Sequence, residues 1–499
     1  MSAGLKRTLG PWQYFSFAFG TIVGVGWVVL LGDWLQRGGP LGAILGFAIG
    51  GALMTLIGLC YAEAATMFPV SGGEVAFAFE AFGTGPAYAI GWALVMMNIA
   101  AVAYVASSMA WILDYLIPGI QGPALYAFRG TEIHLGSLVV ALLTIGWFTW
   151  INWRGVRSSG RFQDLFTYGK LVVAAVFIAA GILGGRVANL EPPFSTEGGR
   201  PPLGGVLAVM AVVPWFLGGF NTIPQVMEEK AEHTPLRLVG RITLLSIVVG
   251  AAFYCLVILS ASMAVPWQDL LTRELPAAAA FREAFGSELL ARLVLLAGLL
   301  GIATVGNGTF VAATRLLFAL SRASLLGHAF RRTHLVTGAP DRAILFTGLV
   351  AALGTLLGRQ GIGPIVAVGA IALSLGYLIT SAAVLRLRFT APTRPRPYRI
   401  RAGVAVALAA SLSSVGLVVA ALRDPWVSSG GRIPFEWLLL GAWGGIGLLL
   451  WLANRTARLA LGVDERRAVI LGVGAMDTRS VSPTGRASAA PAPGSPPRG

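Results

Sequence analysis

Two apolar segments of this chain contain glycines where an unbroken helix would otherwise run, and these breaks hold the groups best suited to bind a small molecule. The first break, residues 20–26, reads GTIVGVG, and the second, residues 215–221, reads WFLGGFN. A backbone that leaves the helix within a membrane must line a cavity or lie buried in protein, because lipid offers no hydrogen-bond partner. Two such breaks at matching places in the two halves of a chain indicate a binding site.

The first break can bind both ends of a zwitterion. Backbone N–H groups at the start of the half-helix after the break attract a carboxylate, since the helix dipole also favours negative charge there. Carbonyl groups at the end of the preceding half-helix attract an ammonium group. The alternative is a packing face of small residues at Gly20 and Gly24, which is common between membrane helices. The expected ligand contacts are Thr21, Ile22, Gly24, Val25 and Gly26.

The second break offers an aromatic ring and further backbone groups. A Trp beside the break gives a flat apolar surface whose π face can also contact a cation. Two alternatives stay open: Pro214 and Pro224 can kink a helix without making a site, and Trp215 can be an ordinary packing or interfacial residue. The expected ligand contacts here are Trp215, Gly218, Gly219, Phe220 and Asn221.

Lys170 and Asn98 are polar side chains within apolar segments. A Lys inside a membrane span is costly and indicates a function. Alternatively, Lys170 lies within about two turns of the end of its segment and extends to water. Asn98 could contact a ligand, or it could make a hydrogen bond between helices.

The composition of the chain requires a membrane. Of its 499 residues, 56% are hydrophobic and only 12% are charged, and the mean hydropathy is +0.75, which is too apolar for a soluble domain. The net charge of +15 does not indicate nucleic acid, because membrane proteins collect Lys and Arg in cytoplasmic loops. Cys60 and Cys255 are isolated and the four His residues map to loops, so no disulfide framework, metal site, cofactor or catalytic cluster is expected.

Twelve apolar stretches are long enough to cross about 30 Å of hydrocarbon, which predicts an all-α polytopic membrane protein. Positive charge gathers after the fourth span, at Arg154, Arg157 and Arg161, and after the tenth span, between residues 386 and 401. This pattern predicts that both termini are cytoplasmic. The predicted spans are residues 12–35, 40–68, 86–116, 136–153, 166–183, 203–227, 239–263, 289–320, 343–357, 362–387, 404–422 and 435–453.

One membrane domain, residues 1–460, accounts for most of the chain. Past residue 461 the sequence turns polar, and after Ser480 it is rich in Pro, Ala, Ser, Gly and Arg, so residues 461–499 are expected to form a disordered cytoplasmic tail. No other segment is long enough for a separate soluble domain. Sensing or catalysis by an appended module is therefore not expected.

Five motifs, in the right order between residues 20 and 399, resemble those of the amino acid–polyamine–organocation transporters. Each motif alone is modest in specificity, and their order identifies the chain as a member of that superfamily. The motifs are the helix 1 glycines (residues 20–26), the end of helix 2 (YAE at 61–63 and FPVSGG at 68–73), helix 6 (GGFNTIPQ at 218–225 with Glu228 and Glu229), helix 8 (Asn307, Thr314-Arg315 and LFALSR at 317–322), and the loop before helix 11 (RPYR at 396–399).

The resemblance implies a fold of two inverted five-helix repeats, residues 12–187 and 203–388, in which helices 1 and 6 are broken. Two extra helices follow at 402–456, and substrate lies between helices 1, 3, 6 and 8. Relatives place an aromatic gate over the bound amino acid where this chain has Trp215. Several relatives also carry a helix 5 Lys whose ammonium replaces the second sodium ion of sodium-coupled members. Lys170 would then join helix 5 to the break in helix 1 without a metal ion.

Two positions depart from the pattern of the superfamily. Many relatives have Asp after Gly-Phe in helix 6, whereas this chain has Asn221, and a small aliphatic residue usually follows the helix 1 glycines where this chain has Trp27. The missing carboxylate argues against binding of a cationic side chain at Asn221. A large ring at Trp27 is expected to shrink the pocket or change its gate.

The leading hypothesis is a secondary active transporter that moves an amino acid or related small amine across the cytoplasmic membrane by alternating access. Coupling to protons through Lys170, or exchange, is expected, and the bilayer and the substrate are the expected partners. A passive channel is the alternative, although pore-lining charge rings and filter motifs are not evident. A transport-inactive nutrient sensor on the same fold also stays open.

Overall fold

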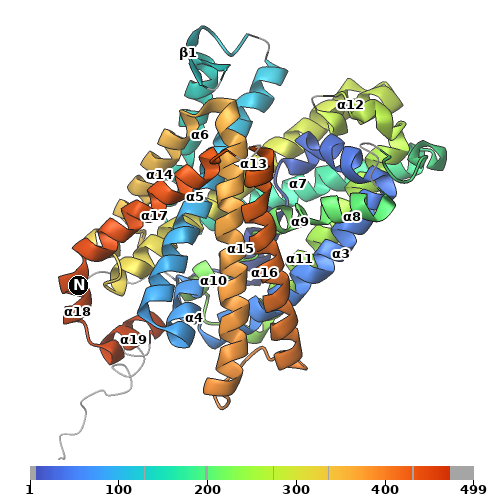
Figure 1. Ribbon diagram of the computed structural model, residues 1–499. Helices are drawn as coiled ribbons and strands as arrows, with labels where there is room; N and C mark the ends of the chain where they lie inside the picture. Colours follow the sequence, from blue (N-terminus) through green and yellow to red (C-terminus); the bar gives the residue numbers. More distant parts are fainter. Residues whose placement is uncertain are drawn as a thin grey trace, which may run out of the picture.

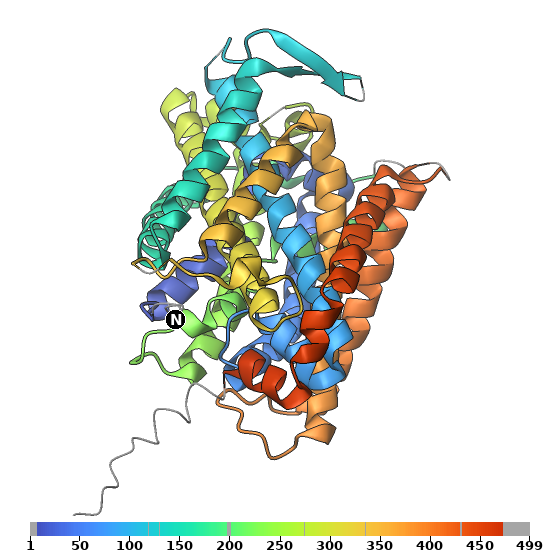
Figure 2. The same cartoon turned by 90° about the vertical axis from the view of Figure 1, so that its left-hand side faces the viewer.

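The computed structural model describes residues 7–117, 119–128, 130–196, 201–273, 275–334, 336–429 and 432–472. Its helices pack side by side, and a small antiparallel hairpin of β1 (Ala124–Phe128) and β2 (Thr131–His134) stands at one end of the bundle (Figures 1 and 2). The long helices are α3 (Leu31–Met67), α5 (Thr84–Leu116), α6 (Leu135–Trp153), α7 (Val156–Gly184), α11 (Leu236–Ala264), α13 (Glu288–Arg322), α14 (Asp341–Thr355), α15 (Gly358–Thr390), α16 (Gly403–Ser428) and α17 (Phe435–Ala453).

Shorter helices complete the bundle and its two ends. They are α1 (Pro11–Ile22), α2 (Gly26–Val29), α4 (Gly73–Phe82), α8 (Pro202–Met210), α9 (Val213–Phe216), α10 (Thr222–Gln225), α12 (Pro276–Phe285), α18 (Arg455–Ala460) and α19 (Val463–Leu471). Single turns of 3₁₀ helix lie at η1 (Val187–Leu190), η3 (Met227–Glu229), η4 (Trp267–Leu270) and η5 (His328–Arg331).

Ten helical stretches among the described residues are long and apolar enough to cross a membrane, which confirms an all-α polytopic membrane protein. Two of the twelve predicted spans are not among these ten. The span predicted at 343–357 corresponds to α14, which has only 15 residues, and the span predicted at 203–227 is divided among α8, α9 and α10. The count of twelve crossings therefore stays a prediction.

The helix breaks predicted from the glycines are present in the structure. The first lies between α1 and α2, where Val23 has an extended backbone with φ −90° and ψ 91°. The second lies between α9 and α10, where Gly219 has a φ of +108°. Residues that carry a Cβ rarely adopt such a backbone, so a glycine is required for the second break.

One boundary differs from the prediction. The first and second predicted spans meet in the single element α3, which kinks at Gly39 and Pro40. Gly39 has a φ of 68° and a ψ of 177°, a backbone that glycine adopts readily because it lacks a Cβ, and the following Pro40 also disfavours a helical backbone at this position. The end of the first span therefore continues directly into the second.

The tail expected to be disordered from residue 461 contains the short helix α19, so that boundary was wrong. The Arg466 guanidinium is buried and donates to the carbonyl groups of Ala323, 3.2 Å away, and Leu461, 3.1 Å away. Ala323 caps the end of α13, where carbonyl groups lack helical partners and attract a cation. The remainder of the predicted tail, residues 473–499, lies outside the described residues.

Candidate functional site

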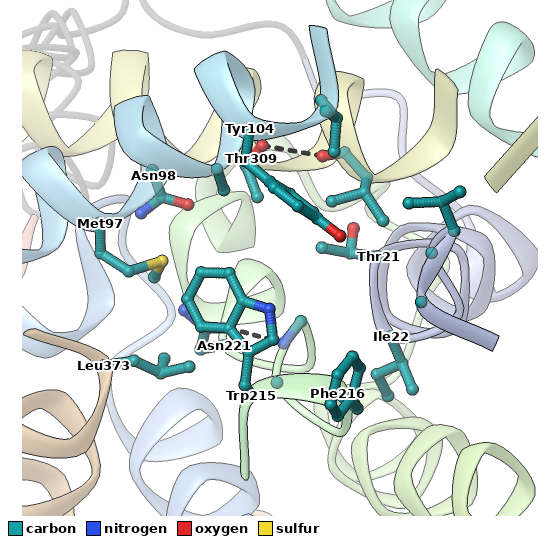
Figure 3. A pocket seen from close by; sticks show the side chains of 18 of the residues that line it. Thr21, Ile22, Met97, Asn98, Tyr104, Trp215, Phe216, Asn221, Thr309 and Leu373 are labelled. Atoms are coloured by element: carbon teal, nitrogen blue, oxygen red, sulfur yellow. Dashed lines mark hydrogen bonds between the residues drawn. The ribbon is translucent and has the colours of Figure 1, made fainter. Parts of the chain in front are cut away.

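A cavity of about 70 Å³ lies where the two helix breaks meet. The breaks form one part of its wall, and the continuous helices α5, α11, α13 and α15 form the rest (Figure 3). The lining residues are Thr21, Ile22, Gly24, Val25, Gly26, Met97, Asn98, Ala101, Tyr104, Val105, Trp215, Phe216, Gly218, Gly219, Asn221, Tyr254, Val305, Thr309 and Leu373.

All the predicted ligand contacts except Phe220 line this cavity. The Phe220 ring is fully buried elsewhere, with its centroid 5.1 Å from that of Tyr61 and 5.7 Å from that of Tyr377. The Phe220 side chain therefore does not line the cavity, and a role for this residue in substrate binding stays a prediction. A large ring stabilises the protein most when it packs against other rings, and two such rings lie on the side of the break away from the cavity.

The two breaks approach each other closely. A Cβ added at Gly219 would lie 2.7 Å from the backbone nitrogen of Ile22 and 2.8 Å from the carbonyl carbon of Thr21. The Asn221 side chain accepts a hydrogen bond from the Gly219 N–H over 3.0 Å, which holds the turn. Asn221 therefore stabilises the break as well as lining the cavity.

Three aromatic residues that the sequence analysis missed complete the cavity. The ring of Tyr104, on α5, lies edge-on to Trp215 with a centroid distance of 6.4 Å, and Figure 3 shows the two rings reaching into the cavity from opposite sides. Tyr254 donates to the Ile22 carbonyl over 2.9 Å, and Phe216 contacts the space beside Gly26. The tyrosine hydroxyls in apolar helices were the available signal for Tyr104 and Tyr254.

The polar side chains in the cavity are neutral. Asn98 donates to the Leu94 carbonyl of its own helix over 2.8 Å, and its Oδ1 has no partner among the described residues. The predicted alternative, a hydrogen bond between helices, is therefore not seen for Asn98. Thr21 and Thr309 each donate to a carbonyl of their own helix, Phe17 and Val305 respectively. The described lining residues include no charged side chain.

Lys170 is fully buried and joins α7 to the first break. Its Nζ donates to the Gly20 carbonyl over 3.1 Å, to the Val23 carbonyl, and to the Thr304 hydroxyl over 2.9 Å. The Thr304 hydroxyl in turn donates to the Gly20 carbonyl over 2.7 Å. The alternative in which Lys170 extends to water is therefore wrong for this structure.

Trp27 does not narrow the cavity as expected. Its ring is buried against Phe177 and Phe253, with centroid distances of 5.2 Å and 5.9 Å, and it does not line the cavity. The ring follows the break on the side where α7 and α11 pack, and burial among aromatic rings accounts for its position.

Ion pairs close one end of the bundle below the second break. Glu229 is buried and pairs with the equally buried Arg315 of α13, while Glu228 pairs with Arg322. Tyr14 of α1 donates to the Val226 carbonyl over 3.1 Å. These contacts join α1 and α13 to the segment after α10.

The profile of a known protein family, described as amino acid permease, matches residues 9–444 of this chain. The chain belongs to the amino acid permease family. The match confirms the resemblance to the amino acid–polyamine–organocation superfamily, and it makes this permease a multi-pass membrane transporter and not an enzyme. Amino acid transport is the function of the family, and small-molecule amino acids are its substrates.

Individual relatives of the permease are similar over most of their length. The methylthioribose transporter of Bacillus subtilis (strain 168) is 27% identical over 430 residues, which are 83% of this chain and 90% of the relative. The branched-chain amino acid permease BcaP of the same organism is 25% identical and the alignment covers 79% of this chain and 84% of the relative. The human large neutral amino acids transporter small subunit 2 is 29% identical, over 79% and 72% respectively.

Proposed function

We propose that the permease is a secondary active transporter that moves a neutral amino acid or a related small molecule across the cell membrane by alternating access. The observation that carries the proposal is the cavity between two helix breaks. Twelve spans, two inverted repeats at residues 12–187 and 203–388, extra helices at 402–456, and cytoplasmic termini fit this proposal. Broken helices from two repeats that face each other give a site which either end of the protein can open.

The chemistry of the cavity favours a zwitterion with an uncharged side chain. Amides at Gly24, Val25 and Gly26 precede the first closed turn of α2, where helical N–H groups lack helical partners, and they suit a carboxylate. The Asn98 Oδ1, which has no partner among the described residues, suits an ammonium group. No carboxylate lines the described cavity to bind a cationic side chain. The relatives named for branched-chain and large neutral amino acids agree with this preference.

Trp215 is proposed as the gate. The cavity of about 70 Å³ is far smaller than the roughly 300–1,000 Å³ of ordinary ligand pockets, so side chains must move before a substrate can enter. Trp215 and Tyr104 face each other across the cavity with ring centroids 6.4 Å apart, and movement of the second break away from α5 would separate them. Occlusion by two rings supports alternating access rather than a passive channel, which needs a continuous path.

Lys170 is proposed as the coupling residue. Its ammonium binds two carbonyls of the first break, so gain or loss of the proton changes how tightly α7 holds that break. A buried amine that bonds carbonyl oxygens is stabilised as the charged form by these bonds and destabilised by loss of water. Proton symport and exchange are both consistent with this role.

Uptake against a gradient tests the proposed function. The purified permease in proteoliposomes should accumulate a radiolabelled branched-chain amino acid above the external concentration when an inward proton gradient is imposed, or when the vesicles hold excess unlabelled substrate. Strictly downhill flux under both conditions would overturn the coupled-transporter proposal in favour of a channel. Binding with no flux in either direction would favour a sensor.

The Gly26→Leu substitution should abolish substrate binding. A Cβ at this position would lie 2.6 Å from the Phe216 ring, so the larger side chain must fill the space beside the exposed amides. We expect the rise in melting temperature caused by saturating substrate in the wild-type protein to disappear. Gly146→Leu is the matched control, because a Cβ at Gly146 meets nothing within 4 Å. Retained affinity in Gly26→Leu would place the substrate elsewhere.

A further inference from the structure

Glu74 is a buried carboxyl without an ion-pair partner among the described residues. It lies at the start of α4, and its side chain is fully shielded from solvent. Its Oε2 accepts a hydrogen bond from Nε2 of Gln225, whereas its Oε1 has no partner in the described part of the chain. A buried carboxylate normally has a cation or several donors around it, since loss of hydration costs several kcal/mol. Its surroundings therefore suit the neutral acid better than the anion.

The partner amide also has an unused acceptor. Gln225 Oε1 accepts no hydrogen bond from any described residue, although the residue is almost fully buried. A carboxyl and a primary amide can pair through two hydrogen bonds, in which the amide donates to one carboxyl oxygen and the acid hydroxyl donates to the amide oxygen. One proton on Glu74 Oε1 would supply the donor that both unpartnered oxygens lack. The same proton would remove a buried charge.

The surrounding titratable groups offer no competing charge. The phenols of Tyr61, on α3, and Tyr377, on α15, face the carboxyl, and Tyr377 donates to the Pro214 carbonyl over 3.4 Å. On α5, Tyr88 donates to the Gly447 carbonyl. Several charged groups on the elements around α4 pair with each other: Glu63 with Arg388 and Arg396, Glu80 with Arg394 and Arg467, Glu228 with Arg322, and Glu229 with Arg315. Arg386 of α15 lies over the Phe82 ring at the other end of α4.

The Glu74 carboxyl lies where α4 contacts α10. Gln225 ends α10, the helix that begins directly after the second break, and α10 lies beside α4 (Figure 1). A Cβ at Gly73 would overlap the Pro224 side chain, so the two helices touch at this point without a spare gap. Phe220 lies in the chain between Gly219 and Asn221, which line the cavity, and its ring packs against both phenols that face Glu74.

We propose that Glu74 is a proton-binding site that fastens α10 to α4 when protonated and weakens that contact when ionised. The protonated acid forms both hydrogen bonds with Gln225 and keeps the end of the bundle closed. The carboxylate has to regain water, which requires α10 to move away from α4. Opening of this end would then depend on the pH on its own side of the membrane. The relevance to transport rests on the proposed function, whereas the proton site itself does not.

Stability as a function of pH tests the site without substrate. Burial raises the pKa of the Glu74 carboxyl from 4.5 to about 7, while the nearby polar groups of the backbone, Tyr61 and Gln225 oppose the rise. Between those pH values the folded protein keeps a proton that the unfolded chain has lost. Wild-type stability therefore falls as the pH rises from 4.5 to about 7, and this group contributes no further change above that range.

The Glu74→Gln variant should remove that dependence, because an amide mimics the protonated acid and can form both hydrogen bonds with Gln225. Its melting temperature minus that of the wild type, measured in detergent from about pH 5 to about pH 8, should rise by several degrees and level off near pH 7. The same substitution at Glu80, on the same helix, is the matched control and should give a difference that does not depend on pH in this way. A Glu74→Gln difference that is constant with pH would overturn the proposal.

Two further measurements test the proposal if the Glu74→Gln variant does not fold. Gln225→Leu removes the amide that donates to the carboxylate, so the fall in stability should extend to higher pH than in the wild type. In the wild-type protein, amide hydrogen exchange of residues 222–229, corrected for the intrinsic pH dependence, should be faster at about pH 8 than at about pH 6. An unshifted profile in Gln225→Leu, or exchange that does not change with pH, would each contradict the proposal. If these pH effects are observed but the wild-type protein transports no substrate, the proposed function is overturned and the proton site is not.

Discussion

Lys170→Met should reduce uptake by about 100-fold or more while the protein still folds. The substitution keeps most of the apolar stem and removes three hydrogen bonds from Nζ, two of which hold the first break. Hydrogen bonds from a charged donor contribute roughly 1.5–3 kcal/mol each, and 1.4 kcal/mol corresponds to about tenfold, so two lost bonds suffice for this effect. Initial rates of labelled substrate uptake into proteoliposomes, at matched protein content, give the measurement.

The uptake that remains in the Lys170→Met variant, measured with and without a proton gradient, distinguishes a coupling role of Lys170 from a purely structural role. If its proton drives transport, the variant loses the dependence of uptake on the imposed proton gradient, and Lys170→Arg, which cannot give up its proton, loses it as well. Lys230→Met is the matched control, because within the described part of the chain the Nζ of this Lys donates to the carbonyls of Ala231 and Thr234, near one end of the bundle, and to neither helix break. A Lys170→Met variant with the wild-type response to the proton gradient would refute the coupling role.

Gly219→Ala should abolish transport and lower the melting temperature. A φ of +108° is strained for any residue with a Cβ, at a cost of about 1–3 kcal/mol, and the added Cβ would also press on the backbone of Thr21 and Ile22. The strain and the contact both act at the point where the two breaks meet. Thermal unfolding and uptake, measured on the same preparation, should therefore both fall.

Gly286→Ala is the matched control for Gly219→Ala. Gly286 also has a positive φ, +58°, but a Cβ there meets nothing within 4 Å. This control should show a modest loss of stability and nearly unchanged uptake. Equal losses of uptake in both variants would mean that the contact between the breaks has no part in transport.

The sequence was informative wherever a backbone feature needs a particular residue type. Glycine marked both breaks because only glycine tolerates the φ of residue 219 and the space left beside Gly26. Lys170 was identifiable because a charge in an apolar segment is rare. Asn221 could be assigned to the cavity, but its bond to the Gly219 N–H could not be predicted, since a local turn bond depends on the conformation of the break.

Other features depended on tertiary packing that no local pattern encodes. Tyr104 and Tyr254 lie on helices far along the chain from the breaks, and only the fold brings them to the cavity. Phe220 and Trp27 are both next to cavity residues, yet each ring faces aromatic neighbours instead. Glu74 gave no signal because its significance lies in the missing cation, and which charges pair with which is decided by packing.

The division of the cavity wall between broken and continuous helices separates two properties that selection can act on. Residues at the breaks determine whether the site can open to either side of the membrane, so most substitutions there should abolish transport. Met97, Asn98, Thr309 and Leu373 belong to helices that run unbroken past the cavity, so they can vary with little effect on the moving parts. Mutations on the continuous helices can thus change which substrate is bound, while the broken helices keep the conformational change that opens the site.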